Sequence, residues 1–261
     1  MDTRSLLDDA SSRMDTAFAQ QEATSLDAYY LGRSVAANIL AAYKPYTGNP
    51  GLTRYLNLIC QTIVINSAFP DLFNGYHVMI LDSPEFNAFA APSGHIFITR
   101  GLVEVTASED MLAALIAHEL AHIMYKHGLN LISNMRLLDD MAASADRATQ
   151  LAGNNEATAR FTYFRNSIGA MVNALVRSGF SQEQEFEADE GAVVLLAASG
   201  YNPAGLLDML RVLQRVQTSQ RGGFNVTHPN PAQRLERAQN YARQYQVRDT
   251  QSYRESRFMN K

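Results

Sequence analysis

The spacing of apolar residues predicts a mostly helical protein. Over most of the chain these residues recur every three or four positions, which is the period of a helix with one buried face. Breaker clusters such as KPYTGNPG at residues 44–51 interrupt this period and mark turns. The helices are expected at residues 5–44, 52–66, 129–151, 156–178, 182–199, 203–218 and 231–245, in addition to one around residues 113–128.

One short region has a different pattern. Three runs, HVMILD (77–82), FNAFAA (86–91) and HIFITR (95–100), are rich in β-branched and aromatic residues, and a Pro-Ser-Gly turn joins the last two. We expect them to form a small sheet, antiparallel in part. The fold class predicted from these patterns is mainly α with a small β-sheet (α+β).

The helix around residues 113–128 has clear end signals. Thr106 and Glu109 fit a capping box at its start, and Lys126, His127 and Gly128 are typical of a helix C-terminus. The stretch AALIAHELAHIMYKHG nevertheless places three polar groups inside an apolar run. These groups therefore need an explanation.

His118 and His122 lie only about 40° apart on the helix cylinder, so both imidazoles can reach one ion. Glu119 falls on the neighbouring flank, and the apolar stripe of the helix leaves the two rings at its margin. The alternative is two core histidines satisfied by backbone carbonyls and one surface glutamate. The stripe consists of Leu112, Ile116, Leu120 and Ile123.

A second helix offers a third ligand. The segment SGFSQEQEFEADEGAVVLLAASG opens with a capping box at Ser181 and Gln184 and ends at Gly200. Glu185 and Asp189 are four residues apart on one face, which suits one carboxylate on a metal and the other on a ligand histidine. Acidic residues near a helix N-terminus also favour the macrodipole without any metal. The remaining acids are expected to be solvated: Glu183, Glu187 and Glu190.

Two imidazoles and one carboxylate leave a fourth tetrahedral position open for water, as in a catalytic zinc site. We therefore expect one Zn2+ per chain. Glu119 is placed to take the proton as water attacks a polarised carbonyl, and then to pass it to the departing amine. A purely structural zinc site would normally use four protein ligands, and the single cysteine, Cys60, is far from the motif in sequence.

Composition narrows the class of protein further. The chain has 261 residues with 46% hydrophobic residues, 18% charged residues and a formal charge of −4, so nothing indicates nucleic acid as a partner. One cysteine cannot close an intrachain disulfide. No apolar stretch reaches the length of an integral membrane span, and the first residues lack the pattern of a signal peptide. The sequence gives no indication of an oligomeric state.

We expect a single domain over residues 1–261. Its parts are N-terminal helices at 1–75, the sheet at 76–105, zinc-binding helices with a lid or packing segment at 106–200, and C-terminal helices with a His-Pro loop at 201–261.

Five blocks together resemble a known family: NAFAAPSGHIFITRGLVEV, LIAHELAHIMYKH, EFEADEGA, GYNP and THPNPAQRL. Their order and spacing are similar to those of the gluzincin metallopeptidases, which include CAAX prenyl proteases and bacterial envelope quality-control proteases. The resemblance implies a zincin-like fold, with zinc on His118, His122 and Glu185, Glu119 as catalytic base, and Asp189 supporting the ligands. Because the chain carries no membrane span, it should resemble the soluble periplasmic branch.

The resemblance also implies roles for the block THPNPAQRL. His228 is similar to the family histidine that faces the zinc, where it either hydrogen-bonds the oxyanion or caps the metal at rest, and Arg234 should anchor the segment. From the residues alone, His228 is a loop histidine before a proline. The other histidines receive no metal role, His127 being interpreted as a helix C-terminal cation and His77 and His95 as strand residues.

The favoured function is a zinc endopeptidase that cleaves unfolded or misassembled proteins, with the strand around Phe97 offering its backbone edge to an extended peptide. By resemblance we expect a bacterial periplasmic or envelope location, with a leader absent from this chain; the cytoplasm is the alternative. The competing function is a zinc-containing chaperone or assembly factor with a capped, mostly inactive site.

Overall fold

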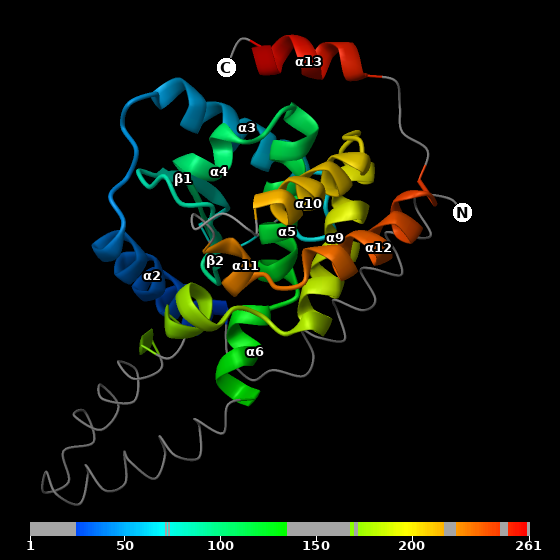
Figure 1. Ribbon diagram of the computed structural model, residues 1–261. Coiled ribbons are helices and arrows are strands. Elements are labelled where there is room, and N and C mark those ends of the chain that lie inside the picture. Colours follow the sequence, from blue (N-terminus) through cyan, green and yellow to red (C-terminus); the bar gives the residue numbers. More distant parts are fainter. Residues whose placement is uncertain are drawn as a thin grey trace, which may run out of the picture.

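The computed structural model describes residues 25–70, 72, 74–134, 168–169, 172–216, 223–245 and 250–259 (Figure 1). Helices surround a three-stranded sheet and a central helix, α5, in agreement with the predicted α+β class. The elements are α2 Ser25–Ala42, α3 Pro50–Val64, β1 His77–Leu81, β2 Ala88–Ala91, β3 His95–Thr99, α4 Arg100–Glu104, α5 Glu109–Met124, α6 His127–Asn134, η1 Ala174–Ser178, α9 Gln182–Ala198, α10 Ala204–Val216, α11 Phe224–Thr227, α12 Pro231–Ala242 and α13 Gln251–Met259.

Most predicted elements lie within a few residues of their observed bounds. The parts of the predicted helices at residues 5–24, 135–151 and 156–167 lie outside the described residues, as does most of the segment 129–178, expected to form a lid or to pack in the core. Three helices were not predicted: α4, the four-residue α11 in the expected loop, and α13. In the part of the chain that the structure describes, no helix is both long and apolar enough to cross a membrane.

The sheet is mixed, with strand order β1-β3-β2. β3 pairs in parallel with β1 and antiparallel with β2, so the predicted partly antiparallel sheet is confirmed. The prediction that the strand around Phe97 offers a free edge is wrong, because β3 is the central strand and both its edges are paired. Of the described strands, β2 lies at the edge of the sheet nearest α5.

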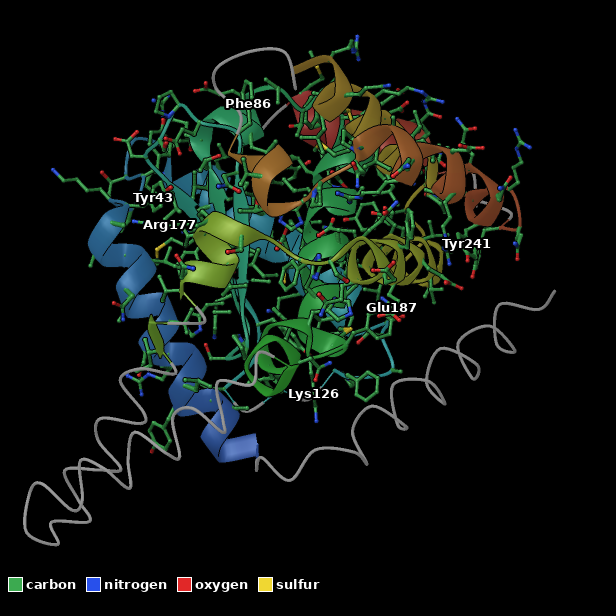
Figure 2. The ribbon with its side chains drawn as sticks, turned by 60° about the horizontal axis from the view of Figure 1, so that its bottom comes forward. Tyr43, Phe86, Lys126, Arg177, Glu187 and Tyr241 are labelled. Atoms are coloured by element: carbon green, nitrogen blue, oxygen red, sulfur yellow. The ribbon has the colours of Figure 1, made fainter. Side chains whose placement is uncertain are left out.

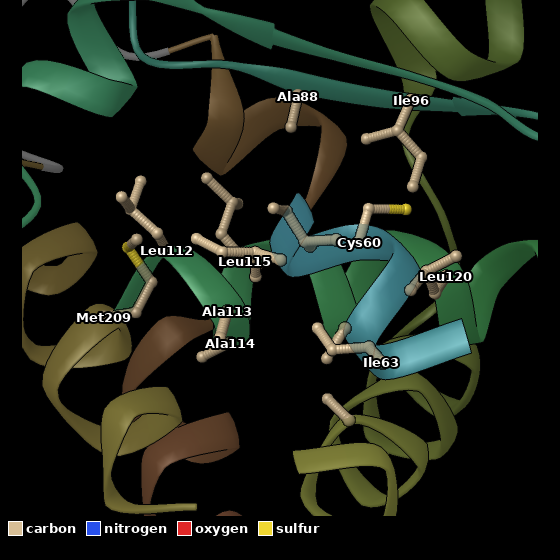
Figure 3. Close-up of a cluster of buried hydrophobic side chains, with 14 of the residues drawn as sticks. Cys60, Ile63, Ala88, Ile96, Leu112, Ala113, Ala114, Leu115, Leu120 and Met209 are labelled. Carbon is tan, nitrogen blue, oxygen red and sulfur yellow. The ribbon is translucent and has the colours of Figure 1, made fainter. Parts of the chain in front are cut away.

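Helix α5 runs through the middle of the molecule and is buried on every side. Helices α3, α9 and α10 and strand β2 all pack against it, and all its residues from Met111 to Met124 are buried. The predicted apolar stripe is buried, but the expectation that His118 and His122 lie at its margin is wrong, because neighbours close the other faces too. Figure 3 shows Cys60 of α3, Ile96 of β3 and Met209 of α10 in the apolar layer around α5.

The N-terminus of α5 also differs from the prediction. Ser108, not Thr106, is the N-cap, and its hydroxyl accepts a hydrogen bond from the Met111 backbone N–H at 3.2 Å. The Thr106 hydroxyl instead donates to the Val103 carbonyl at 2.7 Å. Glu109 thus occupies the first helical position, and its carboxylate serves a tertiary contact rather than a capping box.

Candidate metal centre

Four side chains from three segments converge beside α5. His118 and His122 come from successive turns of α5, Glu185 from the first turns of α9, and His228 from the segment between α11 and α12. Each offers one ligand atom, and these atoms all lie within 4.8 Å of one another. All four residues are buried. A cluster of this size and donor composition can hold one metal ion.

The distances between the ligand nitrogens and oxygens place these atoms around one point. The two histidine Nε2 atoms are 3.1 Å apart, and each lies 3.5 Å from an oxygen of Glu185. His228 Nδ1 is 2.9 Å from Glu185 Oε1 and 3.3 Å from His118 Nε2. The sequence resemblance had grouped these four residues, and the structure brings them together.

Local sequence explains how α9 delivers Glu185. The predicted capping box is confirmed: the Ser181 hydroxyl accepts from Gln184 N–H, and the Gln184 side chain accepts from Ser181 N–H. Gly191 allows α9 to approach α5 closely, because a Cβ there would lie 2.7 Å from Tyr125 Cε2 and 3.0 Å from Ala121 Cβ. The tight helix contact sets the reach of Glu185 to the two histidines.

A second glycine positions His228. Gly179 has φ +73°, and a Cβ on it would lie 2.3 Å from the Thr227 carbonyl oxygen. This close approach lets Phe180 N–H donate to that carbonyl at 3.1 Å. Thr227 Oγ1 also donates to Asn87 Oδ1 at 3.0 Å, which ties the segment to the start of β2.

Asp189 and Arg234 lie behind the ligands. Asp189 Oδ1 is 3.1 Å from His118 Nδ1, the ring nitrogen that faces away from the cluster. Arg234 donates two hydrogen bonds to Asp189, from Nε at 2.8 Å and from Nη2 at 2.7 Å. Its Nη1 lies 2.7 Å from Glu185 Oε2. One buried guanidinium therefore holds both carboxylates of α9.

Burial and charge shift the protonation of these groups in opposite directions. Burial disfavours an ionised Glu185, yet His228 and Arg234 outweigh it and hold its pKa well below the usual range. Burial and Arg234 lower the pKa of His118, but the carboxylates of Asp189 and Glu185 raise it to about 9. Burial lowers the pKa of His122. The chain thus presents an ionised carboxylate and a neutral imidazole, and an ion would displace a proton from His118.

Glu119 differs from the other buried acids. It is fully buried, and neither carboxylate oxygen has a hydrogen-bond partner among the described residues. In the cluster, His228 Nε2 lies 3.6 Å from Glu119 Oε1. Burial raises the pKa of its carboxyl, and the charges of His228 and His118 offset this only in part. A buried carboxylate of this kind is suited to accepting a proton.

The residues present fit zinc. Zinc binds histidine nitrogens and carboxylate oxygens, and the converging donors are of these two kinds. The unpartnered oxygens of Glu119 beside the cluster indicate that the site accommodates a polar group absent from the protein itself. His118, His122 and Glu185 would hold the ion, with His228 in reach as a fourth donor.

The sequence interpretation of His127 is wrong. The side chain is not a helix-end cation facing solvent: it is buried, and its Nδ1 lies 2.8 Å from His122 Nδ1. Its Nε2 lies 3.1 Å from Glu187 Oε2, so Glu187 is not merely solvated either. The contact depends on the chain reversal at Lys126, which has φ 56°. No spacing rule for a continuous helix would have found it.

Helix α5 with its HExxH sequence, together with a glutamate from a second packed helix, defines the class of zincin-type metallopeptidase sites. The sequence profile of Peptidase family M48 matches residues 50–242, which contain the complete cluster. The chain belongs to peptidase family M48, a family of metallopeptidases.

Three curated relatives illustrate the similarity. The chain is 27% identical to the Beta-barrel assembly-enhancing protease of Escherichia coli K12 over 215 residues, 80% of this chain and 42% of that protein. It is 25% identical to the Mitochondrial metalloendopeptidase OMA1 of Schizosaccharomyces pombe (75% and 55% covered) and 27% identical to the Metalloprotease LoiP of Escherichia coli K12 (66% and 66%). The chain spans less than half the length of the beta-barrel assembly-enhancing proteases that it matches.

Proposed function

We propose that this protein is a zinc-dependent endopeptidase that hydrolyses peptide bonds in unfolded or misassembled proteins. The observation that carries the proposal is the convergence of His118, His122 and Glu185 beside the buried, unpartnered carboxylate of Glu119. A binding module has no use for a proton acceptor at that position, whereas hydrolysis requires one.

The roles of the residues follow from their positions. When bound, zinc would polarise the scissile carbonyl and lower the pKa of water. Glu119 accepts the proton of the attacking water and delivers it to the departing amine. Asp189 accepts a hydrogen bond from His118 Nδ1, which leaves Nε2 unprotonated toward the ion, and Arg234 fixes Asp189 in place.

Strand β2 provides the natural partner for an extended substrate. Thr99 N–H donates to the Asn87 carbonyl at 3.0 Å, so by antiparallel alternation Ala88 and Ala90 direct their backbone groups away from β3. Ala88 N–H donates to Asn87 Oδ1 at 2.9 Å, so we propose that a substrate pairs through the Ala88 carbonyl and Ala90. A peptide paired there would lie beside α5, which packs against β2. Main-chain pairing tolerates different side chains and favours unfolded substrates.

The described conformation is closed over this edge. Ala88 and Ala90 are buried, and η1 and α11 pack together beside β2 and Asn87. His228 occupies the space between Glu119 and the ligand atoms. We propose that His228 caps the metal at rest and that substrate enters when the α11 segment is displaced.

The biological setting is inferred from similarity. Relatives of this chain include a protease named for enhancing beta-barrel assembly, and a tolerant endopeptidase suits the removal of misassembled proteins. We therefore propose action in the bacterial envelope.

A digest of fluorescein-labelled casein by the zinc-loaded protein tests the proposed base. We expect cleavage by the wild type, loss of cleavage with a chelator, and a decrease of about 10² to 10⁴-fold in Glu119→Gln, because the base is removed while the ligands stay. Zinc content, measured by atomic emission, should be unchanged in this variant. Glu183→Gln, an exposed acid on α9, is the matched control. Undiminished cleavage by Glu119→Gln would exclude the assigned base.

The same digest distinguishes the endopeptidase from a second candidate function, a zinc-containing chaperone with a capped site. The position of His228 beside Glu185 favours this second candidate. If His228 is only a cap, His228→Ala should cleave casein faster than the wild type. If His228→Ala binds zinc and holds unfolded casein without cleaving it, the chaperone function is favoured.

A further inference from the structure

A second polar chain of contacts lies behind the ligand His122. His122 Nε2 faces the cluster, and its other nitrogen, Nδ1, lies 2.8 Å from His127 Nδ1. His127 Nε2 in turn lies 3.1 Å from Glu187 Oε2. In Figure 2, Glu187 on α9 is labelled near Lys126, the residue that precedes His127 at the junction of α5 and α6. Three elements therefore meet behind one ligand.

The proton positions along this chain are determined by its outer end. The Glu187 carboxylate accepts from His127 Nε2–H at 3.1 Å, so a singly protonated His127 ring has its proton on Nε2. The His127 Nδ1 atom is then an acceptor, and it requires a donor from His122. With His127 singly protonated, His122 carries its proton on Nδ1, which leaves the Nε2 lone pair directed at the cluster; a doubly protonated His127 would reverse this bond. The opposite arrangement would set a lone pair of His127 against a carboxylate.

The surroundings hold both rings in this geometry. Phe180 stacks on the His122 ring with centroids 3.9 Å apart and planes at 16°. Lys126 adopts the left-handed conformation, which reverses the chain so that His127 begins α6 and points back at α5. His127 is 2% exposed. Only the carboxylate at the outer end reaches solvent, since Glu187 has a side-chain exposure of 62%.

We propose that His127 is a positioning residue, with Glu187 as its partner, and that this pair selects the metal-binding tautomer of His122. The inference rests on the metal site of the proposed function but not on catalysis. Each ligand histidine of α5 then has a carboxylate behind it: Asp189 contacts His118 directly, and Glu187 contacts His122 through the imidazole of His127. Outer partners of this kind orient a ligand ring and raise its basicity.

Zinc affinity of the full chain, measured by competition with a chromophoric chelator, tests the proposal. His127→Asn keeps an acceptor oxygen near the Nδ1 position, whereas His127→Leu has nearly the same shape and no acceptor. We expect affinity to decrease about 10 to 100-fold in His127→Leu and to be largely retained in His127→Asn. Glu187→Ala should give a smaller decrease, and Glu183→Ala on the same helix should give none.

Nitrogen-15 NMR of the metal-free protein is the second measurement. A proton on His122 Nδ1 in the wild type, lost from that position in His127→Leu, supports the relay. A proton on Nε2, equal zinc affinity in wild type and His127→Leu, or equal decreases in the Asn and Leu variants would overturn it. If the wild type binds no zinc, the proposed function fails, and the tautomer measurement still decides the relay.

Discussion

The two ends of α5 both bury charged residues, but only one end forms a site. At the N-terminal end, Glu109 accepts hydrogen bonds from Tyr55 at 2.7 Å and from Arg257 Nε at 3.0 Å, and Arg254 pairs with Asp110 at 2.8 Å. Every charge there has a partner from α3 or α13. Burial and Glu109 raise the pKa of Tyr55, which keeps its hydroxyl a neutral donor.

At the C-terminal end the charges are arranged differently. The ligand atoms of His118, His122 and Glu185 converge within 4.8 Å of one another, and neither carboxylate oxygen of the adjacent Glu119 has a hydrogen-bond partner among the described residues. Such an arrangement is costly without a bound cation. A buried acid without a hydrogen-bond partner beside converging ligand atoms, such as Glu119, therefore indicates function, whereas a buried acid with its own donors, such as Glu109, indicates anchoring.

Replacing Arg234 with methionine should have the largest effect on stability. The change removes the shared partner of Asp189 and Glu185 and leaves two buried carboxylates, so we expect the free energy of unfolding of the metal-free protein to decrease by about 3–5 kcal/mol. Urea denaturation measures this free energy of unfolding. Arg237→Met is the control on the same helix, because Arg237 is exposed and stacks over Phe186. A decrease no larger than that of the control would mean that Arg234 does not hold these acids.

Glu109→Gln should have an intermediate effect. A neutral amide weakens the hydrogen bonds from Tyr55 and Arg257, which should lower the free energy of unfolding by roughly 2 kcal/mol. Zinc affinity and casein cleavage per folded molecule should not change, because this end of α5 only anchors α3 and α13. Altered zinc affinity would show that the two ends of the helix are coupled.

Arg257→Ala should have the smallest effect. The Arg257 side chain is 53% exposed, so water and salt already screen its pair with Glu109, and we expect at most about 1 kcal/mol. The difference from wild type, measured by thermal unfolding, should shrink further in 1 M NaCl. A larger loss than in Glu109→Gln would reverse this ranking and make α13, rather than the Glu109 carboxylate, the dominant anchor.

Local sequence patterns correctly predicted the features that depend only on residues close together in the chain. The capping box at Ser181 and Gln184 and the four-residue spacings of His118 with His122 and of Glu185 with Asp189 follow from helix geometry alone. The mistakes concern contacts between distant segments. Thr106 and Ser108 are both residue types that cap helices, and the residues around Thr106 match a capping box. Ser108 is the N-cap only because of the path that the chain takes after α4.

From the amino-acid sequence alone it follows that two helices carry a histidine pair and an acidic pair on single faces, because the helical repeat fixes these relations within each segment. Contacts between distant segments set which faces meet, that β2 rather than β3 is the edge strand beside α5, and that His127 and Glu187 lie behind His122. Strand order and chain reversals bring together residues far apart in the sequence, and no local period encodes them.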